Sequence, residues 1–346
     1  MESRSGADLA MKTKLNFLWI DDDPRRTRSS LALERSIKVI VNFVDVKGKE
    51  ILPIIQKVGS GEALPDLVLI DHLLDKISKG ERGIIKYGSG VAEIIRSRLG
   101  PSQKKQCPIV GVTAAIKVGE ESSFQEKFRY DAIVPFENLS EHYSTLVSLA
   151  KGYAILRGAR ISNLDSLLTL LKPPEEDRGK LYGVVPSGLR GDYTAMKPIF
   201  DYSRWVRYTL LRRAGFLYDD LWTATILGLK LSALEKVKRI IRNAEYKGIF
   251  GDATEPRWWQ TTLRQILFKV YSGEPNLDLR DLGRALKPVK ESDFSVCYSC
   301  KQDKPDLVGY TDETRKKRVQ LHLRCSVVSE KAQRVPFFEE ERIMGD

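Results

Sequence analysis

The sequence predicts an α/β domain built on a five-stranded parallel sheet, followed by a helical region and a small cysteine-bearing unit. Over residues 14–157, short apolar runs alternate with helical patterns. Each run is nearly continuous in its hydrophobicity, as strands covered on both faces are. With 346 residues, of which 42% are apolar, the chain exceeds one ordinary domain and can bury a core. It has no run of about 20 apolar residues, so no membrane span is expected.

The five predicted strands are short and rich in Val, Ile, Leu and Phe: LNFLWI, IKVIVNFV, DLVLID, CPIVGV and DAIVPF. Helical patterns follow them at residues 25–36, 49–58, 91–98, 122–129 and 141–157. Strand and helix therefore alternate along the chain, and right-handed crossovers between parallel strands place helices on both faces of the sheet. The expected fold is a doubly wound α/β domain over residues 14–157.

The composition and the hydrophobic periodicity of the chain change after this domain. Residues 158–199 are rich in Pro, Gly and charge, which predicts a linker or irregular connection. Residues 200–290 show helical periodicity and a basic composition, and residues 291–346 contain three of the four cysteines. The sequence therefore predicts a basic helical domain followed by a C-terminal unit of its own.

The charge is unevenly distributed. Residues 1–150 hold 22 basic and 20 acidic side chains, whereas residues 151–346 hold 35 and 26, within a net charge of +11. A basic half is compatible with a polyanionic partner such as nucleic acid, and also with a basic solvated surface.

The first residues, MESRSGADLAMKTK, lack the apolar segment of a secretory signal. We therefore expect a cytoplasmic protein. In a reducing cytosol, cysteines serve as metal ligands or core side chains rather than as disulfides.

Polar side chains stand where the predicted strands end. The first strand ends in Asp21, Asp22 and Asp23, the third in Asp71 and the fourth in Thr113. Because loops at the carboxyl ends of the strands form the ligand crevice of a doubly wound sheet, we expect these side chains to meet. A hard divalent cation with oxygen ligands would relieve the repulsion between the carboxylates. The sequence therefore predicts a Mg²⁺ site.

The motifs FLWIDDDP, DLVLID and PIVGVTAA resemble those of the receiver domains of two-component response regulators, in the same order along the chain. The resemblance implies a flavodoxin-like fold in which Asp21, Asp22 and Asp71 hold Mg²⁺. It also implies that Asp71 accepts a phosphoryl group from a sensor kinase and that Thr113 senses the acyl phosphate. A carboxylate can attack phosphorus when a metal neutralises the phosphoryl oxygens.

The chain departs from the receiver pattern at three places. Val134 precedes Pro135 where receivers carry a Lys, Asp131 occupies the place of an aromatic switch residue, and the loop after Asp71 is longer than usual. Four cations of this loop are candidates for the missing charge: Lys76, Lys79, Arg82 and Lys86. The alternative is a pseudo-receiver whose carboxylates persist without phosphotransfer and whose surface binds a partner.

Residues 221–246 set two helices around a short turn and resemble a helix-turn-helix module. Ala224 permits a close crossing of the two helices, and Gly228 permits the turn. Four basic side chains near or on the second helix are candidates for DNA contact: Lys230, Lys236, Arg239 and Arg242. The alternative is the solvated face of a helical bundle.

Two close pairs of metal ligands lie in the C-terminal unit. Cys297 and Cys300 form C-x₂-C, and His322 with Cys325 forms H-x₂-C. Four such ligands suit a closed tetrahedral Zn²⁺ site with a structural role, and the predicted hairpin between them resembles treble-clef zinc folds. The alternative is a small apolar cluster with free thiols.

Together these patterns predict a signalling protein that acts as a two-state switch. Metal binding or phosphorylation at the acidic pocket would bias the basic, zinc-containing half toward or away from DNA. The alternative partner is a kinase-like or ATPase protein in a stress or defence pathway. An autonomous enzyme is not expected, because the sequence has no nucleophile–base pair, phosphate-binding glycine loop or open metal site.

Overall fold

A computed structural model of the chain describes residues 14–60, 64–82, 85, 87–100, 105–113, 129–159, 161, 163–190, 198–253, 255–271, 278–303, 307–311, 317–323 and 325. The chain divides into two compact units. The N-terminal unit comprises Met1–Leu170 and Val185–Trp205, and the C-terminal unit comprises Leu171–Val184 and Val206–Asp346. Within the described residues, no helix is long and apolar enough to cross a bilayer.

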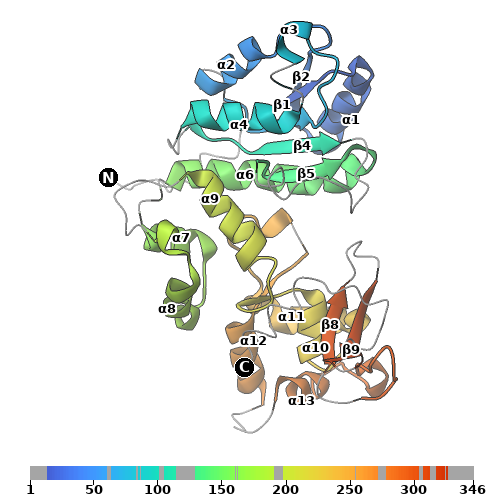
Figure 1. The fold of residues 1–346 in the computed structure, drawn as a ribbon. Coiled ribbons are helices and arrows are strands. Elements are labelled where there is room, and N and C mark those ends of the chain that lie inside the picture. The colour runs from blue at the N-terminus through green and yellow to red at the C-terminus, as the bar shows by residue number, and fades with distance from the viewer. Residues whose placement is uncertain are drawn as a thin grey trace. The chain divides into compact units, whose positions relative to one another are not determined.

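The N-terminal unit is built on a parallel sheet with the strand order β2-β1-β3-β4-β5 (Figure 1). The five strands are β1 (Asn16–Asp21), β2 (Ile40–Asp45), β3 (Leu67–Asp71), β4 (Ile109–Thr113) and β5 (Ala132–Pro135). Each lies within one of the predicted apolar runs or within a few residues of it. The order reverses between β1 and β3, which is the arrangement of a flavodoxin-like doubly wound fold. The predicted fold class is therefore confirmed.

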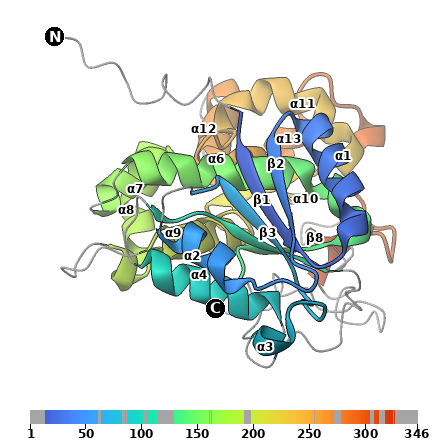
Figure 2. The ribbon, with the colours of Figure 1, turned by 90° about the horizontal axis from the view of Figure 1, so that it is seen from above.

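Helices cover both faces of this sheet (Figure 2). The main helices are α1 (Thr27–Ile37), α2 (Leu52–Ser60), α4 (Gly88–Leu99) and α6 (Tyr143–Ala159), with a short α3 (Lys79–Arg82) in the loop after β3. α2 packs against α4 on one face, and α1 packs against α6 on the other. The core between sheet and helices is aliphatic and includes Ile20, Val68, Ile70, Val91, Ile95 and Ile109. The helix predicted at residues 122–129 lies outside the described residues except for its last position, Arg129.

The connection expected to be irregular is helical over two of its described stretches. It contains α7 (Leu164–Leu171) and α8 (Glu175–Val184), so the prediction of an irregular segment is wrong there. α7 forms because LDSLLTLL places buried leucines on one face. α8 begins directly after two prolines and carries three acidic residues in its first turn, where they complement the helix dipole. The two prolines therefore mark the start of a helix and not an irregular connection.

A later segment completes the N-terminal unit. α9 (Ile199–Arg204) packs against α6. The Phe200 ring lies under the guanidinium groups of Arg96 (3.8 Å from its carbon to the ring centroid) and Arg204 (5.2 Å). The Phe200 backbone N–H donates to Gln106 Oε1 (3.2 Å). These contacts attach residues 198–205 to the receiver-like sheet, although they follow α8 of the other unit in the sequence.

The C-terminal unit combines helices with small β elements. Its helices are α8, α10 (Asp220–Ile226), α11 (Leu234–Ile241), α12 (Gln260–Val270) and α13 (Leu279–Arg284), and its strand pairs are β6 (Leu217–Tyr218) with β7 (Trp258–Trp259) and β8 (Leu307–Thr311) with β9 (Arg318–His322). β8 packs on α10 so closely that a Cβ at Gly309 would lie 3.0 Å from Leu221 Cγ. The helical segment and the cysteine-bearing hairpin therefore share one packed unit.

Candidate functional site

The carboxyl edge of the sheet brings three carboxylates together. Asp21 ends β1 and Asp71 ends the neighbouring β3, and Asp22 follows Asp21. Each of the three offers an oxygen within 4.8 Å of the others, and all three side chains are buried. We call these residues the acidic pocket. Their convergence is the geometry that the strand order predicts.

Thr113 ends β4, the other neighbour of β3. It is largely buried and pairs in register with Pro135 of β5. The preceding residue, Val112, pairs with Asp71, and its carbonyl accepts the backbone N–H of His72 (2.7 Å). Thr113 therefore stands at the same edge of the sheet as the acidic pocket.

The acidic pocket disfavours full ionisation. Burial raises the pKa of Asp71 to about 7, and repulsion from Asp21 adds to this rise, whereas the cation of Arg26 opposes it. Burial also raises the pKa of Asp21 and of Asp22 above the usual range. Buried carboxylates in this state gain from a hard divalent cation, so the donor set fits Mg²⁺.

Backbone and indole groups orient the carboxylates. Asp21 Oδ1 accepts the backbone N–H of Asp23 (2.8 Å), and Asp21 Oδ2 accepts the indole N–H of Trp19 (3.2 Å). Asp22 Oδ2 accepts the backbone N–H of Lys76 (2.7 Å), which belongs to the loop after β3. The pocket is thus held in shape by its own surroundings.

The long loop after Asp71 is anchored to the sheet domain. Glu81 of α3 is buried, and its carboxylate accepts the backbone N–H groups of Ile51 (2.5 Å) and Leu52 (3.1 Å). These donors stand at the first turn of α2, where helix N–H groups have no partner within the helix. The loop therefore contributes a helix cap as well as the contact between Lys76 and Asp22.

A cation that the sequence did not predict, Arg26, lies inside the acidic pocket. Arg26 Nη1 is 3.1 Å from Asp21 Oδ2 and 3.2 Å from Asp71 Oδ1, and the side chain of Arg26 is only 11% exposed. Its guanidinium carbon lies 4.4 Å from the centroid of the Phe136 ring. The Arg-Arg pair directly after DDDP was the available sequence feature, but nothing in it distinguishes an inward from an outward arginine.

Of the four loop cations predicted as candidates for this role, Lys76 has a described contact with the pocket. Its Nζ is 4.0 Å from Asp22 Oδ1, and its side chain is 48% exposed at the rim of the pocket. Lys79 is exposed, whereas Lys86 and the side chain of Arg82 lie outside the described residues. The central cation is Arg26, which comes from the segment before α1.

Asp131, where receivers carry an aromatic residue, has a structural role. Its fully buried carboxylate accepts hydrogen bonds from Arg96 Nη2 (2.6 Å), the Ile109 backbone N–H (2.8 Å) and the Tyr153 hydroxyl. These partners come from α4, β4 and α6. Asp131 therefore joins the start of β5 to three neighbouring elements.

The four predicted zinc ligands converge in the C-terminal unit. Cys297, Cys300, His322 and Cys325 each offer a ligand atom within 4.8 Å of the others. His322 Nδ1 is 3.2 Å from Cys300 Sγ and 3.8 Å from Cys325 Sγ. Two ligands of one tetrahedral Zn²⁺ ion are separated by about 3.5 Å, given Zn–S and Zn–N bonds of about 2.3 and 2.0 Å. The cluster therefore fits zinc, and all four of its positions come from the protein.

Backbone N–H donors favour the thiolate form of Cys297, which is the form that binds a metal. Burial opposes its ionisation, but backbone N–H donors from Cys300, His322 and Ser299 outweigh this effect and lower its pKa to about 7. Lys301 adopts a left-handed conformation (φ 62°), and its N–H donates to the Cys297 carbonyl (2.9 Å). This tight turn, the knuckle, directs the two sulfur atoms to one side, and the thiolate is the form that binds zinc.

The proposed DNA-contacting residues fall into two pairs. Lys236 Nζ is 2.7 Å from both carboxylate oxygens of Asp293, and Lys230 Nζ donates to the Ser292 carbonyl (2.8 Å). Arg239 and Arg242 are exposed. The helix-turn-helix segment itself is present as α10 and α11, joined through Gly228 in a left-handed conformation (φ 65°).

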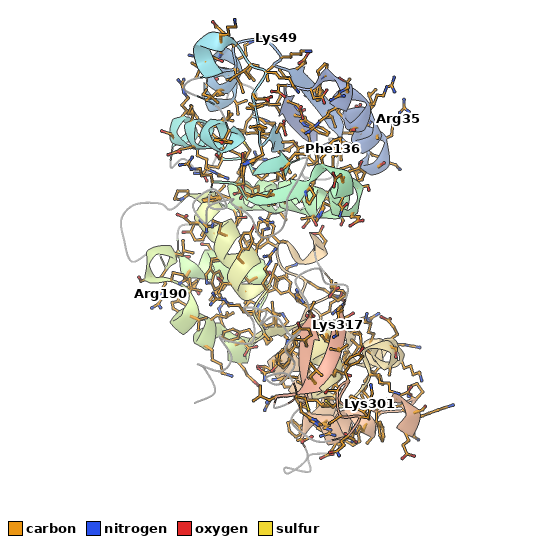
Figure 3. The ribbon with its side chains drawn as sticks, turned by 45° about the vertical axis from the view of Figure 1, so that its right-hand side comes forward. Arg35, Lys49, Phe136, Arg190, Lys301 and Lys317 are labelled. Carbon is orange, nitrogen blue, oxygen red and sulfur yellow. The ribbon has the colours of Figure 1, made fainter. Side chains whose placement is uncertain are left out.

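An exposed aromatic side chain beside the knuckle was also missed. Tyr298 is 52% exposed, and the Nζ atoms of Lys301 and Lys317 lie 4.6 and 5.0 Å from the centroid of its ring. Figure 3 labels both lysines. The sequence YSCK contains Tyr298 and Lys301. It does not show that Lys317, directly before β9, lies beside the same ring.

No protein-family model matches the sequence, and no curated protein matches it. Among solved structures, the chain is similar to the N-terminal domain of a response regulator/sensory box/GGDEF protein from Carboxydothermus hydrogenoformans, with 18% identity, 42% of this chain and 98% of that chain covered, and a TM-score of 0.29. It is also similar to the receiver domain of a sensor histidine kinase from Pseudomonas aeruginosa, solved with a magnesium ion in its active-site cleft (17% identity, 39% and 98% covered, TM-score 0.29).

A third similar structure is the receiver domain of a response regulator from Saccharomyces cerevisiae, solved together with a histidine phosphotransfer protein. It is 14% identical, covers 40% of this chain and 90% of that chain, and has a TM-score of 0.30.

Proposed function

We propose that this protein is a signalling switch whose acidic pocket binds Mg²⁺ and whose Asp71 accepts a phosphoryl group, and that the state of the pocket controls the basic C-terminal unit. The observation that carries the proposal is the meeting of Asp21, Asp22 and Asp71, all buried, at the carboxyl edge of a doubly wound sheet. We also propose a cytoplasmic location, a compartment that suits the free cysteines Cys107, Cys297, Cys300 and Cys325.

The residues of the pocket and the neighbouring Thr113 share the tasks of this mechanism. A carboxylate oxygen of Asp71 attacks phosphorus, and the bond between phosphorus and the donor breaks with its electron pair passing to the donor. Bound Mg²⁺ supplies charge neutralisation for the phosphoryl oxygens. Asp21 and Asp22 would hold the ion together with Asp71. The Thr113 hydroxyl, at the same edge of the sheet, is suited to donate to a phosphoryl oxygen.

Phosphotransfer is tested with a small phosphodonor such as acetyl phosphate and Mg²⁺, followed by intact-protein mass spectrometry. Wild-type protein should gain the mass of one phosphoryl group, and Asp71→Asn should gain none. Asp45→Asn, at the end of β2 on the far side of β1 from Asp71, is the matched control and should be labelled like the wild type. If wild-type protein is not labelled, phosphotransfer is excluded and the pseudo-receiver alternative stands.

Nucleic acid is the partner that the C-terminal unit favours. Residues 151–346 hold the excess of basic side chains, Arg239 and Arg242 are exposed on or beside α11, and Tyr298 offers a half-exposed ring beside Lys301 and Lys317. Exposed guanidinium groups bind phosphates, and an exposed aromatic ring stacks on unpaired bases. These features support contact with DNA.

Salt-titrated binding to duplex and single-stranded DNA tests this part of the proposal. Replacing Arg239 and Arg242 by Ala should weaken binding and lower the slope of log affinity against log salt by about 2 if both contact phosphates. Replacing Lys230 and Lys236, which are already engaged by Ser292 and Asp293, is the matched control and should change the slope less. Absent or salt-insensitive binding would contradict a nucleic-acid partner.

A pseudo-receiver adaptor is the second candidate function. Val134 stands in place of the receiver lysine, and two of the four candidate DNA contacts are occupied within the chain. In this version the protein binds a sensor kinase or another kinase-like or ATPase protein, without DNA contact. Unlabelled Asp71 together with no DNA binding would favour it.

A further inference from the structure

Two neighbouring arginines have opposite environments at the entrance to α1. Arg25 points outward, with 86% of its side chain exposed, and pairs with Asp23 (2.7 Å). Arg26 points inward and contacts both Asp21 and Asp71 through a single nitrogen, Nη1. The chain thus places one permanent positive charge inside the acidic pocket and one outside it.

The guanidinium group uses the oxygens that a metal would need. Asp21 Oδ1 already accepts the Asp23 N–H, and Asp21 Oδ2 is shared by Trp19 and Arg26. Asp71 Oδ1 is also engaged by Arg26. A divalent cation held by Asp21 and Asp71 would need oxygens that Arg26 already engages. Repulsion between a divalent cation and a guanidinium group at short range is strong in a pocket shielded from water.

We infer that Arg26 is a resident counter-ion of the acidic pocket, and that a divalent cation enters by displacing Arg26 from Asp21 and Asp71. This inference rests on the metal binding proposed above. Arg26 is not a ligand. It sets the affinity of the pocket for the metal, because the ion must replace two ion pairs that the protein already makes.

Displacement of Arg26 would change the environment of Trp19, which can be followed by fluorescence. Arg26 stacks on Phe136 (4.4 Å), and Phe136 packs edge-on against Trp19, with ring centroids 6.4 Å apart. The Trp19 indole also donates to Asp21. Phe136, labelled in Figure 3, begins the turn that leads from β5 into α6. Exchange of Arg26 for a metal therefore changes the surroundings of a fully buried indole and of the β5–α6 connection.

Mg²⁺ titration of the full-length protein tests the exchange, with calorimetry and tryptophan fluorescence as readouts. Mg²⁺ is chosen because it does not favour the thiolates of the zinc cluster. Arg26→Gln should bind Mg²⁺ about tenfold tighter than wild type or better, because the competing charge is gone. Arg25→Gln, the matched control, should stay within about twofold of wild type, because Arg25 lies outside the pocket.

Phe136→Leu provides a second, milder variant. It keeps every carboxylate and both arginines but removes the ring that holds Arg26, so Mg²⁺ affinity should rise by about twofold to fivefold. Circular dichroism and thermal unfolding without metal establish that each variant is folded. Should Arg26→Gln not fold, an unchanged affinity in Phe136→Leu overturns the inference.

The outcomes separate this inference from the proposed function. Equal or weaker Mg²⁺ binding by Arg26→Gln, with clear binding by wild type, overturns the exchange and leaves the proposed metal site standing. Absence of Mg²⁺ binding in both proteins overturns the exchange and the proposed metal site together. Tighter binding in Arg26→Gln, with Arg25→Gln unchanged, supports both.

Discussion

Asp71 has a buried carboxyl group whose charge is compensated incompletely. Its pKa is raised from 3.8 to about 7, first by burial and then by repulsion from Asp21 and Asp22, against the attraction of Arg26. The neutral carboxyl therefore contributes stability that is fully present below pH 3.8 and is lost as the pH rises through about 7.

This linkage predicts the behaviour of Asp71→Asn without metal. At pH 8 the free energy of unfolding of the variant should be about 1–3 kcal/mol higher than that of the wild type, because a buried charge is removed. The advantage should shrink as the pH falls from 8 to 5.5. Urea unfolding at several pH values measures it, with exposed Glu141→Gln as the control that keeps the wild-type pH dependence. A lower stability of Asp71→Asn at pH 8 would contradict the prediction.

Asp131 and Glu93 give a matched pair of acidic residues facing arginines. Asp131 is fully buried against Arg96, whereas Glu93, on the same helix as Arg96, is 62% exposed and pairs with Arg129 (3.3 Å). Asp131→Asn should cost about 3 kcal/mol, because it leaves buried donors without a charged acceptor. Glu93→Gln should cost less than about 0.5 kcal/mol. Chemical denaturation measures both, and equal costs would refute this account of Asp131.

At this scale, sequence reasoning located the residues whose positions follow from strand ends. Asp21, Asp71 and Thr113 could be predicted because parallel strands place their carboxyl ends at one edge. Arg26 could not, because the direction of a long side chain depends on what packs beside it, and its partner Phe136 comes from a distant part of the sequence.

At the scale of elements, the zinc cluster and the hairpin depend on each other. Gln320 of β9 donates to Thr225 Oγ1 (3.0 Å) and to the Leu229 carbonyl (2.7 Å), so the hairpin that carries His322 is fixed to α10 and the turn after it. A metal bound by the ligands at the end of the hairpin and by the knuckle would connect the hairpin to the knuckle as well. The cluster should therefore support the packing of β8 and β9.

Metal analysis tests the cluster. Purified protein should contain about one equivalent of zinc, and Cys300→Ser should lose it and unfold at lower temperature, because a structural zinc contributes folding free energy. Cys107→Ala is the control: Cys107 is a buried core thiol far along the sequence from the cluster, so zinc content should not change. Metal-free wild-type protein, purified without chelators, would contradict the assignment.

The elements themselves could be predicted where periodicity was strong. The five strands emerged because buried parallel strands are continuous apolar runs. α7 and α8 were not predicted because residues 158–199 are rich in Pro and Gly, which favour irregular structure. The leucines of LDSLLTLL nevertheless form a buried helical face. In the predicted helix-turn-helix segment, 3₁₀ turns flank α11 at both ends. Local composition does not determine which turns of such segments become α-helix and which become 3₁₀ turns.

At the scale of the whole molecule, the chain passes between its two units three times. It leaves the N-terminal unit after Leu170, returns at Val185 and leaves again after Trp205. The boundary at residue 157, expected from the alternation of apolar runs and helical patterns, lies before two segments that this division assigns to the N-terminal unit. Ile199 and Tyr202 of α9 are buried, as are Leu164, Leu167 and Leu168 of α7.

Fragments test this organisation. A fragment of residues 14–205 should be more stable than one of residues 14–159 by about 2 kcal/mol or more, since burying each large aliphatic side chain contributes about 1.5–3 kcal/mol. Thermal and urea unfolding of the two fragments measure the difference. Equal midpoints would mean that α7 and α9 add nothing to the sheet domain.

The return of the chain at Val185 also orders events during protein synthesis. A receiver-like sheet whose last helix ended at residue 159 would fold as soon as that residue left the ribosome. Here the N-terminal unit has to wait for Trp205, and by then the residues of α8 have already emerged without the rest of their own unit. The first half of this protein therefore reaches its finished form only after part of the second half has been made.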